Sequence, residues 1–194
     1  MKRPLIIGLL ILALTLVCMG IVAVGFFRIA NSGFANNNPF DRRNIASQLE
    51  ESKTLKVDPG KPITLKVVDE AGGVTVTGAE VDTVQIKAVK TAYDSSQARA
   101  DAEVKTIKYT IEKTGNNITL KYQIPESMNF NNKVNTVDFI VTVPNEVKVD
   151  INSSTGQVSV TGVQGQVAID NKFGDITVEQ VDGSLDVKTN SGGI

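Results

Sequence analysis

The sequence predicts a mainly β protein: short-strand repeats stacked as a β-solenoid or β-helix-like body, with one short helix and an N-terminal transmembrane helix. Three observations predict this class. Apolar and polar residues alternate in short runs over most of the chain from Thr54 onward, which is typical of half-buried strands. The final third of the chain repeats itself with an 18-residue period. A long uncharged run also stands close to the amino terminus.

The uncharged run extends from Pro4 to Phe27 and follows Lys2 and Arg3. As a helix it would span about 36 Å, enough to cross a bilayer with some tilt. A cleaved signal peptide is the alternative, but its apolar core is normally about 7–15 residues long. We therefore predict an uncleaved transmembrane signal-anchor at residues 1–28, with membrane contact through Pro4–Phe27. Cys18 lies in this run and is interpreted as a buried thiol rather than a lipid-modified cysteine.

Residues 29–53 are predicted to be a linker, because the stretch NSGFANNNPFDRRN is rich in Asn and Gly and has no period. At the end of this linker, residues 45–52 are expected to form a short helical turn. The alternating residues around Val57 and Val67 flank Asp58-Pro59-Gly60, which is strong turn chemistry. A hairpin or strand pair is therefore expected at this point.

The middle of the chain is expected to contain the helix and five further strands. The spacing of apolar residues predicts a helix from Ser96 to about Val104, with Asp94 or Ser95 capping its start. The turn TGNN joins two of the strands and is a good hairpin signal. The strands are expected near residues 74–76, 84–93, 105–113, 117–124 and 136–144.

The chain becomes periodic from Val147. One unit offers about five buried aliphatic side chains, worth on the order of 8–15 kcal/mol. Ordering the backbone of one unit costs about 18–36 kcal/mol, so a unit cannot fold without neighbours and stacking is predicted. The columns with the 18-residue spacing are Gly156/Gly174/Gly192, Val158/Ile176/Ile194, Val160/Val178, Val163/Val181, Gly165/Gly183, Val167/Leu185 and Ile169/Val187.

The third unit has only begun at Ile194. Stacked repeats normally protect their last unit with a polar cap or a covering element, and Gly-Gly-Ile supplies neither. We therefore expect the β domain, residues 54–194, to be truncated at its C-terminal end. The rival expectation is that the edge near Ile194 pairs with a partner strand or with a second copy.

The order of these segments resembles the bacterial putative-adhesin family of membrane-anchored β-strand repeat proteins, a domain of unknown function. The likeness covers roughly Thr54–Ile194, and its most specific part is TVP, an Asn-Glu turn and then SSTGQVSV. The resemblance implies an extracytoplasmic, mostly β domain, often on a single membrane anchor. It also implies that some relatives stand beside cell-envelope stress systems, and it carries over no catalytic residue.

Composition excludes several classes of function. The chain has 20 basic and 21 acidic residues and no basic stripe, so nucleic-acid binding is not expected. Histidine is absent, which removes the commonest acid–base group and the commonest metal ligand. The part of the chain after the anchor has no cysteine, so disulfides and thiol chemistry are not expected there.

The candidate site residues all have a simpler structural interpretation. Ser153 and Ser154 have no histidine to activate them. Gly72-Gly73 and Gly192-Gly193 precede strands and are interpreted as turn or bulge glycines rather than phosphate loops. An acidic set could bind Ca²⁺ but lacks the Gly-rich calcium motif, and its members are typical of turns; they are Asp170, Asn171, Asp175, Asp182 and Asp186. A patch of Tyr122, Phe130 and Phe139 is interpreted as core packing.

No catalytic, cofactor or metal site is therefore predicted. The leading hypothesis is a non-enzymatic, cell-surface binding or scaffolding domain tethered to the membrane, with its β body outside the cytoplasm and an envelope or surface partner. The alternative is a cell-envelope stress sensor or regulator that recognises a membrane-active peptide or lipid. A carbohydrate-acting enzyme on a β-solenoid is a third hypothesis, since carboxylate pairs suffice for that chemistry.

Overall fold

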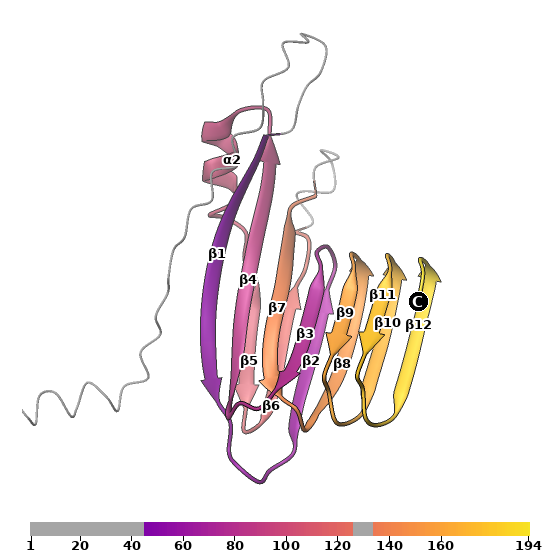
Figure 1. Ribbon diagram of the computed structural model, residues 1–194. Helices are drawn as coiled ribbons and strands as arrows, with labels where there is room; N and C mark the ends of the chain where they lie inside the picture. The colour runs from indigo at the N-terminus through magenta and orange to yellow at the C-terminus, as the bar shows by residue number, and fades with distance from the viewer. Residues whose placement is uncertain (1–44, 126–133) are drawn as a thin grey trace, which may run out of the picture.

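The computed structural model describes residues 45–125 and 134–194, which form two facing β-sheets and one short helix (Figure 1). In the first sheet the strands lie in the order β1 (Ile45–Lys56), β4 (Thr83–Asp94), β7 (Thr136–Pro144), β3 (Val74–Ala79), β9 (Val158–Thr161) and β11 (Ile176–Glu179). In the second the order is β12 (Leu185–Ser191), β10 (Val167–Phe173), β8 (Val147–Thr155), β2 (Ile63–Asp69), β6 (Asn117–Tyr122) and β5 (Thr110–Thr114).

The mainly β class is confirmed, but the body consists of two separate mixed sheets and the described residues show no closed solenoid. Neighbours from β7 to β11, and from β12 to β6, are parallel. By contrast, β1, β4 and β5 pair antiparallel with their neighbours. Antiparallel strands reverse the direction of winding, so the regular coiling predicted from the repeats does not extend over the whole body.

The 18-residue repeat determines the strand register as predicted. Ile176 pairs with Val158, and Leu185 pairs with Val167, so each unit stacks on the preceding one without a slip. The stack also continues where the sequence shows no repeat, because β2 and β3 pair in parallel with β8 and β9. On their other side, β6 and β7 add a further layer of the same kind. Strands remote in sequence therefore extend the stack found from periodicity.

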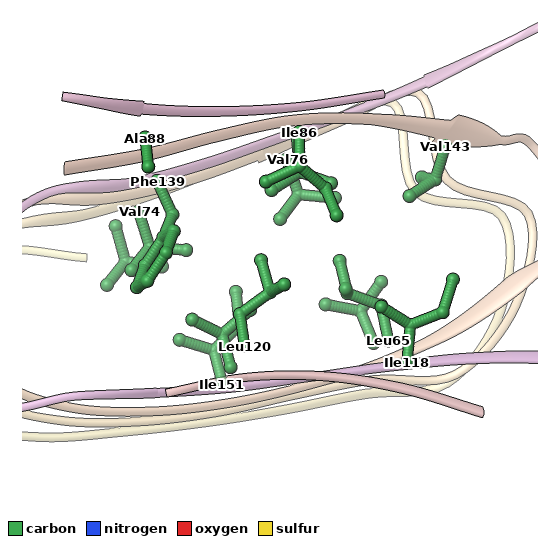
Figure 2. Packing of buried hydrophobic residues seen from close by; sticks show 14 of the residues in the cluster. Leu65, Val74, Val76, Ile86, Ala88, Ile118, Leu120, Phe139, Val143 and Ile151 are labelled. Atoms are coloured by element: carbon green, nitrogen blue, oxygen red, sulfur yellow. The ribbon is translucent and has the colours of Figure 1, made fainter. Parts of the chain in front are cut away.

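The core lies between the two sheets and is almost entirely aliphatic (Figure 2). Leu65, Leu120 and Ile151 rise from one sheet toward Val76 and Phe139 of the other. Alternation along each strand produces this arrangement, since every second side chain points inward. The Tyr122 and Phe139 side chains are fully buried, which confirms their interpretation as core residues. Phe130 lies outside the described residues.

The predicted helix is confirmed as α2 (Gln97–Glu103), which packs against β1 and β4. The predicted cap was wrong by one or two positions: the Ser96 side chain accepts the hydrogen bond from the Arg99 backbone N–H. Asp94 instead accepts a hydrogen bond of 2.7 Å from Nε of Arg99. The guanidinium at that distance holds the pKa of Asp94 well below its usual range.

The helical turn expected at residues 45–52 is wrong, because these residues form most of strand β1. All 12 residues of β1 pair with β4, and this continuous ladder outweighs the modest local helix preference of a Glu-containing segment. Residues 45–53, assigned above to the linker, thus belong to the β body.

The hairpin expected around Asp58-Pro59-Gly60 is also wrong, because β1 and β2 lie in different sheets. The turn is present but carries the chain from one sheet to the other. Asn116 supports it: the Asp58 N–H donates to Oδ1 of Asn116 at 2.8 Å, and Nδ2 of Asn116 donates to the Asp58 carbonyl at 2.9 Å. Turn chemistry was visible in the sequence, but the strand partners were not: β1 pairs with β4, whereas β2 pairs with β6 and β8.

The remaining expected strands are confirmed, including the β5–β6 hairpin at TGNN. The strand expected at 105–113 begins only at Thr110. Across residues 45–125 and 134–194 no helix has the length and apolar character needed to cross a membrane. The predicted anchor at Pro4–Phe27, Cys18 included, lies outside the described residues.

Candidate functional site

A broad groove opens at one end of the body, where β1, β3 and β7 end and β2, β4 and β8 begin. Four separate segments of the chain line it, all of them turns or strand ends: residues 56–64, 79–85, 144–148 and 164–166. Loops held at the end of a rigid sheet are the usual place for binding residues. We call this feature the turn-end groove.

The turn-end groove carries charged and polar side chains among a larger apolar surface, and its charges are nearly balanced. It contains three lysines against four carboxylates, together with amide and hydroxyl side chains such as Thr83, Asn145 and Gln166. One ion pair is formed within it, between Nζ of Lys61 and Oδ2 of Asp58 at 3.0 Å. The hydrogen bond from Lys61, and then its charge, lower the pKa of Asp58. The near balance of lysines and carboxylates gives the groove no excess positive charge that would favour a polyanion.

The opposite end of the body is built around tightly stacked glycines. Gly156 has φ of +144°, and a Cβ placed on it would lie 1.8 Å from the carbonyl oxygen of Gly72. Gly174 and Gly192 meet the preceding coil in the same way. The backbones of successive turns are thus in direct contact, and only glycine fits between them. This confirms that Gly72 and Gly192 are turn glycines.

Beneath these glycines runs a row of polar side chains, three of them buried and the last partly buried, one from each successive strand of the second sheet. Asp69 pairs in register with Ser153, Ser153 with Asn171, and Asn171 with Thr189. Each of the four has one side-chain oxygen without a hydrogen-bond partner, and no other buried side-chain atom in the described part of the chain lacks one. We call these four residues the corner row.

Asp69 is the only member of the corner row that can ionise. Its side chain is 1% exposed, and its Oδ1 accepts the Ala71 N–H at 3.0 Å. Burial raises the pKa of Asp69 to about 8, and the nearby charges of Asp138 and Glu70 add to that shift. Burial also raises the pKa of Tyr122, its neighbour on β6, to about 12. Asp69 is consequently a neutral acid at pH 7.

A second buried polar group lies between β4, β1 and the segment before β5. Lys90 is almost fully buried, and its Nζ contacts Oε1 of Glu51 at 2.6 Å. The other oxygen of Glu51 accepts the hydroxyl hydrogen bond of Tyr109 at 2.8 Å. Burial and the hydrogen bond to Glu51 raise the pKa of Tyr109. The polar atoms of these three side chains satisfy one another, so the group is a structural crosslink between β4, β1 and the segment before β5.

Of the acidic set considered for Ca²⁺, Asp175 and Asp182 lie between strands as predicted for turn residues, whereas Asp170 and Asn171 lie within β10 and Asp186 lies within β12. Nδ2 of Asn171 donates to the carbonyls of Gly156 and Gly174 at 3.0 and 3.1 Å, which fastens two adjacent coils. Asp175 accepts the Gly193 N–H at 2.8 Å, and Asp186 pairs with Lys188 at 3.3 Å. Over the described ranges no three His, Cys, Asp or Glu side chains form a group that could hold a metal ion.

Sequence reasoning missed Asp69, Lys90 and Glu51. Ser153 was noted as a serine without a base, and its actual place is in the corner row. A signal for Asp69 existed, since it stands at an inward position of the alternating strand ITLKVVD. Its partners in the row could not be found from periodicity, because β2 is not one of the recognisable repeats.

The side of the body formed by β11 and β12 presents an open edge of each sheet. Three large apolar side chains are exposed there: Phe173 at 55%, Leu185 at 51% and Ile194 at 77%. Leu185 and Ile194 belong to columns whose other members are buried in the preceding coils. Exposed strand edges of this kind are sites where a further strand can pair.

Comparison with known proteins gives matches only among solved structures. The chain is similar to a putative cell adhesion protein from Clostridium sporogenes, at 14% identity and a TM-score of 0.44, over 76% of this chain and 98% of the other. It is also similar to a putative adhesin from Parabacteroides distasonis, at 10% identity and a TM-score of 0.29, over 74% and 68% of the two chains. A putative adhesin from Bacteroides fragilis matches at 11% identity and a TM-score of 0.26, over 74% and 95%. No family model matches the chain, and no curated protein matches it.

Proposed function

We propose that the protein is a non-enzymatic binding or scaffolding module of the cell surface, tethered to the membrane through Pro4–Phe27, with the turn-end groove as its binding face. One observation carries the proposal. The chain enters the body at Ile45, at the α2 end, and β1 then runs the length of the first sheet to Lys56, which lines the groove. Twelve strand residues span about 40 Å, so β1 separates the groove from the tethered end by that distance.

This arrangement supports presentation of a binding face away from a membrane. The core is a rigid double layer, and the groove consists of loops at its distal end, as in other modules that bind through loops on a scaffold. The adhesin-like resemblance of the sequence supports the same proposal. The predicted pairing of the edge near Ile194 with another strand remains a second proposed contact, supported by the exposed Leu185 and Phe173.

The location of the body can be tested independently of binding. Protease added to intact spheroplasts is expected to digest the β body, because residues after about Asn31 are proposed to face away from the cytoplasm. The chain in lysed spheroplasts provides the reference digestion. Full protection until lysis would contradict the proposed orientation.

The binding face can be tested with the full-length chain in liposomes. We expect these liposomes to be retained on surfaces coated with purified peptidoglycan, and Gln166→Arg in the groove to reduce retention. Gln157→Arg is the matched control, since Gln157 is also exposed but does not line the groove and lies beside Gly156 at the opposite end. Equal retention of both variants and of the unmodified chain would contradict the groove as binding face.

Two further arms address the alternatives. Retention on anionic lipid in place of peptidoglycan, again lost in Gln166→Arg, would favour the envelope-stress sensor that recognises lipid. Release of reducing sugar from peptidoglycan by the purified chain would favour the carbohydrate-acting enzyme and would contradict the non-enzymatic proposal.

A further inference from the structure

The corner row leaves one carboxyl oxygen buried without any compensating group. Oδ2 of Asp69 has no hydrogen-bond partner, and no lysine or arginine of the described residues forms an ion pair with this side chain. An isolated ionised carboxylate is far more costly to bury than a neutral carboxyl group. The geometry of the site therefore requires Asp69 to carry a proton while the corner is closed.

The Ala71 N–H, which donates to Oδ1 of Asp69, favours the ionised form, but burial outweighs it and the charged groups that face Asp69 also oppose ionisation. Glu70 follows it in the chain, Asp138 approaches from β7, and Tyr122 is its neighbour on β6. From β8 it meets Ser153, which does not titrate. The surroundings thus contain negative or neutral groups only, and an ionised Asp69 would lack any cation to offset its charge.

The turn that follows Asp69 lies directly against its side chain. Residues 70–73 form the turn between β2 and β3, and a Cβ on Gly72 would lie 3.1 Å from Oδ2 of Asp69. The other face of this turn lines a hollow together with Asp138, Ile124 and Thr136. Displacement of the turn would therefore give Asp69 a route to water.

Hydrogen bonds from several neighbouring segments close the turn. The Val137 and Phe139 N–H groups donate to the carbonyls of Ala71 and Gly73 at 3.0 and 2.8 Å, and the Glu70 N–H donates to the Tyr122 carbonyl at 3.3 Å. The Ala71 N–H donates to Oδ1 of Asp69 at 3.0 Å, and the Gly72 N–H donates to the Thr155 carbonyl at 3.0 Å. The Gly73 N–H donates to Oδ1 of Asp138 at 2.7 Å. No apolar side chain larger than that of Ala71 belongs to the turn, so little hydrophobic burial opposes its opening.

We propose that Asp69 and the turn at residues 70–73 form a proton-operated latch: the protonated carboxyl keeps the turn closed over the corner row, and ionisation opens the turn to water. Opening hydrates the ionised Oδ2 and gives the neighbouring Ser153 hydroxyl a water partner. The same event widens the hollow beside Asp138. The latch lies at the α2 end of the body, the end at which the chain enters at Ile45.

The latch goes beyond the proposed binding function, and its test does not depend on that function. Hydrogen exchange of the Ala71, Gly72 and Gly73 amides is measured in the full-length chain as a function of pH and corrected for the intrinsic exchange rate. We expect protection of these amides to fall about tenfold for each pH unit between about 4, the ordinary pKa of an aspartate in water, and about 8, the pKa of Asp69 in the closed protein, and to level off at higher pH. The amides of α2 and of the β5–β6 hairpin serve as internal references and are expected to stay protected.

Variants separate the latch from a general loosening of the protein. Asp69→Asn cannot ionise and is expected to keep the turn protected at all pH values, while Asp170→Asn, an exposed change of the same kind, is expected to behave as the unmodified chain. A pH-independent turn in the unmodified chain, or the same loss of protection in Asp69→Asn, would overturn the proposal. Should Asp69→Asn not fold, the carboxyl ¹³C shift of Asp69 decides: titration near pH 4 overturns the latch, and titration near pH 8 supports it.

Discussion

The two lateral halves of the body bury their core residues in different ways. On the β1 side, long antiparallel strands and α2 cover the core, and inward residues such as Ala88 and Leu120 are completely buried. On the β12 side, short parallel strands stack in a fixed register, and burial decreases along the stack. Val167 is fully buried, whereas Leu185, the next member of its column, is exposed at 51%.

The comparison shows that a residue's column in the repeat specifies which way its side chain points, but not how deeply that side chain is buried. Val160 and Val178 are in register and face the same way, yet Val160 is fully buried and Val178 only partly so. The difference is the presence of a neighbouring coil on both sides of Val160. Hydrophobic stabilisation follows the area removed from water, so equivalent positions contribute unequally.

The largest expected effect on stability comes from placing a carboxylate at two positions of one repeat column, one fully buried and the other partly buried. Val160→Asp is expected to destabilise the body by about 3–5 kcal/mol, because an unpaired carboxylate would be buried in the core. Val178→Asp is expected to cost clearly less, because that position lies on the edge strand β11. Gln180→Asp, an exposed position with φ of 52° that Asp tolerates, is the control. Equal shifts in chemical denaturation at 160 and 178 would contradict the comparison.

The next effect tests the contact between coils. Gly156→Ala is expected to cost about 3 kcal/mol, since its Cβ would meet the Gly72 carbonyl oxygen at 1.8 Å and its φ is +144°. Gly115→Ala, where φ is +59° but no atom lies within 4 Å, is expected to cost about 1–2 kcal/mol from backbone strain alone. Thermal melts of the two variants measure the difference, and the reverse order would show that the coils are not in direct contact.

Measuring stability as a function of pH distinguishes Asp69, at the end of β2, from Asn171, which holds the equivalent position in the repeats. Asp69 has its pKa raised from 3.8 to about 8 in the folded protein, so the unfolded chain binds fewer protons between these values. Stability is therefore expected to fall as pH rises from about 4 to about 8, with a slope approaching 1.4 kcal/mol per pH unit. Denaturation at several pH values measures the slope, and Asp69→Asn should remove it. Asn171→Asp is expected to introduce a similar slope into the repeats, and a flat profile there would show that the two corners are not equivalent.

The smallest expected effect on stability concerns the open edge. Leu185→Lys is expected to change stability by no more than about 0.5 kcal/mol, because this side chain is half exposed. It is nevertheless expected to reduce self-association of the chain at high concentration, because a lysine on an edge strand opposes further pairing. Light scattering of the two proteins measures this difference. Identical association would contradict the proposed pairing of the edge near Ile194.

Local sequence pattern alone predicted most strands and the helix, because apolar residues recur with a period of 2 along a strand and 3.6 along a helix. It was also sufficient for the register of the final repeats, since the 18-residue columns leave only one alignment without a slip. It failed at residues 45–52, whose strand conformation comes from pairing with β4, and at the turn after Lys56, where the strand partner lies in another sheet. Both errors concern contacts between segments far apart in the sequence.

The sequence by itself determined that this protein is a β body with stacked repeats, that Gly72 and Gly192 occupy turns, and that its aromatic residues Tyr122 and Phe139 lie in a core. Each of these depends on the local sequence and on the energy of burying alternate side chains. Only the tertiary structure decided that four turns converge on one groove and that Asp69, Ser153, Asn171 and Thr189 form one row. The physical reason is that β2 pairs in parallel with β8, which lies about 80 residues further along the chain. Backbone hydrogen bonds make this pairing and do not depend on side-chain identity, so neither segment's sequence indicates its partner.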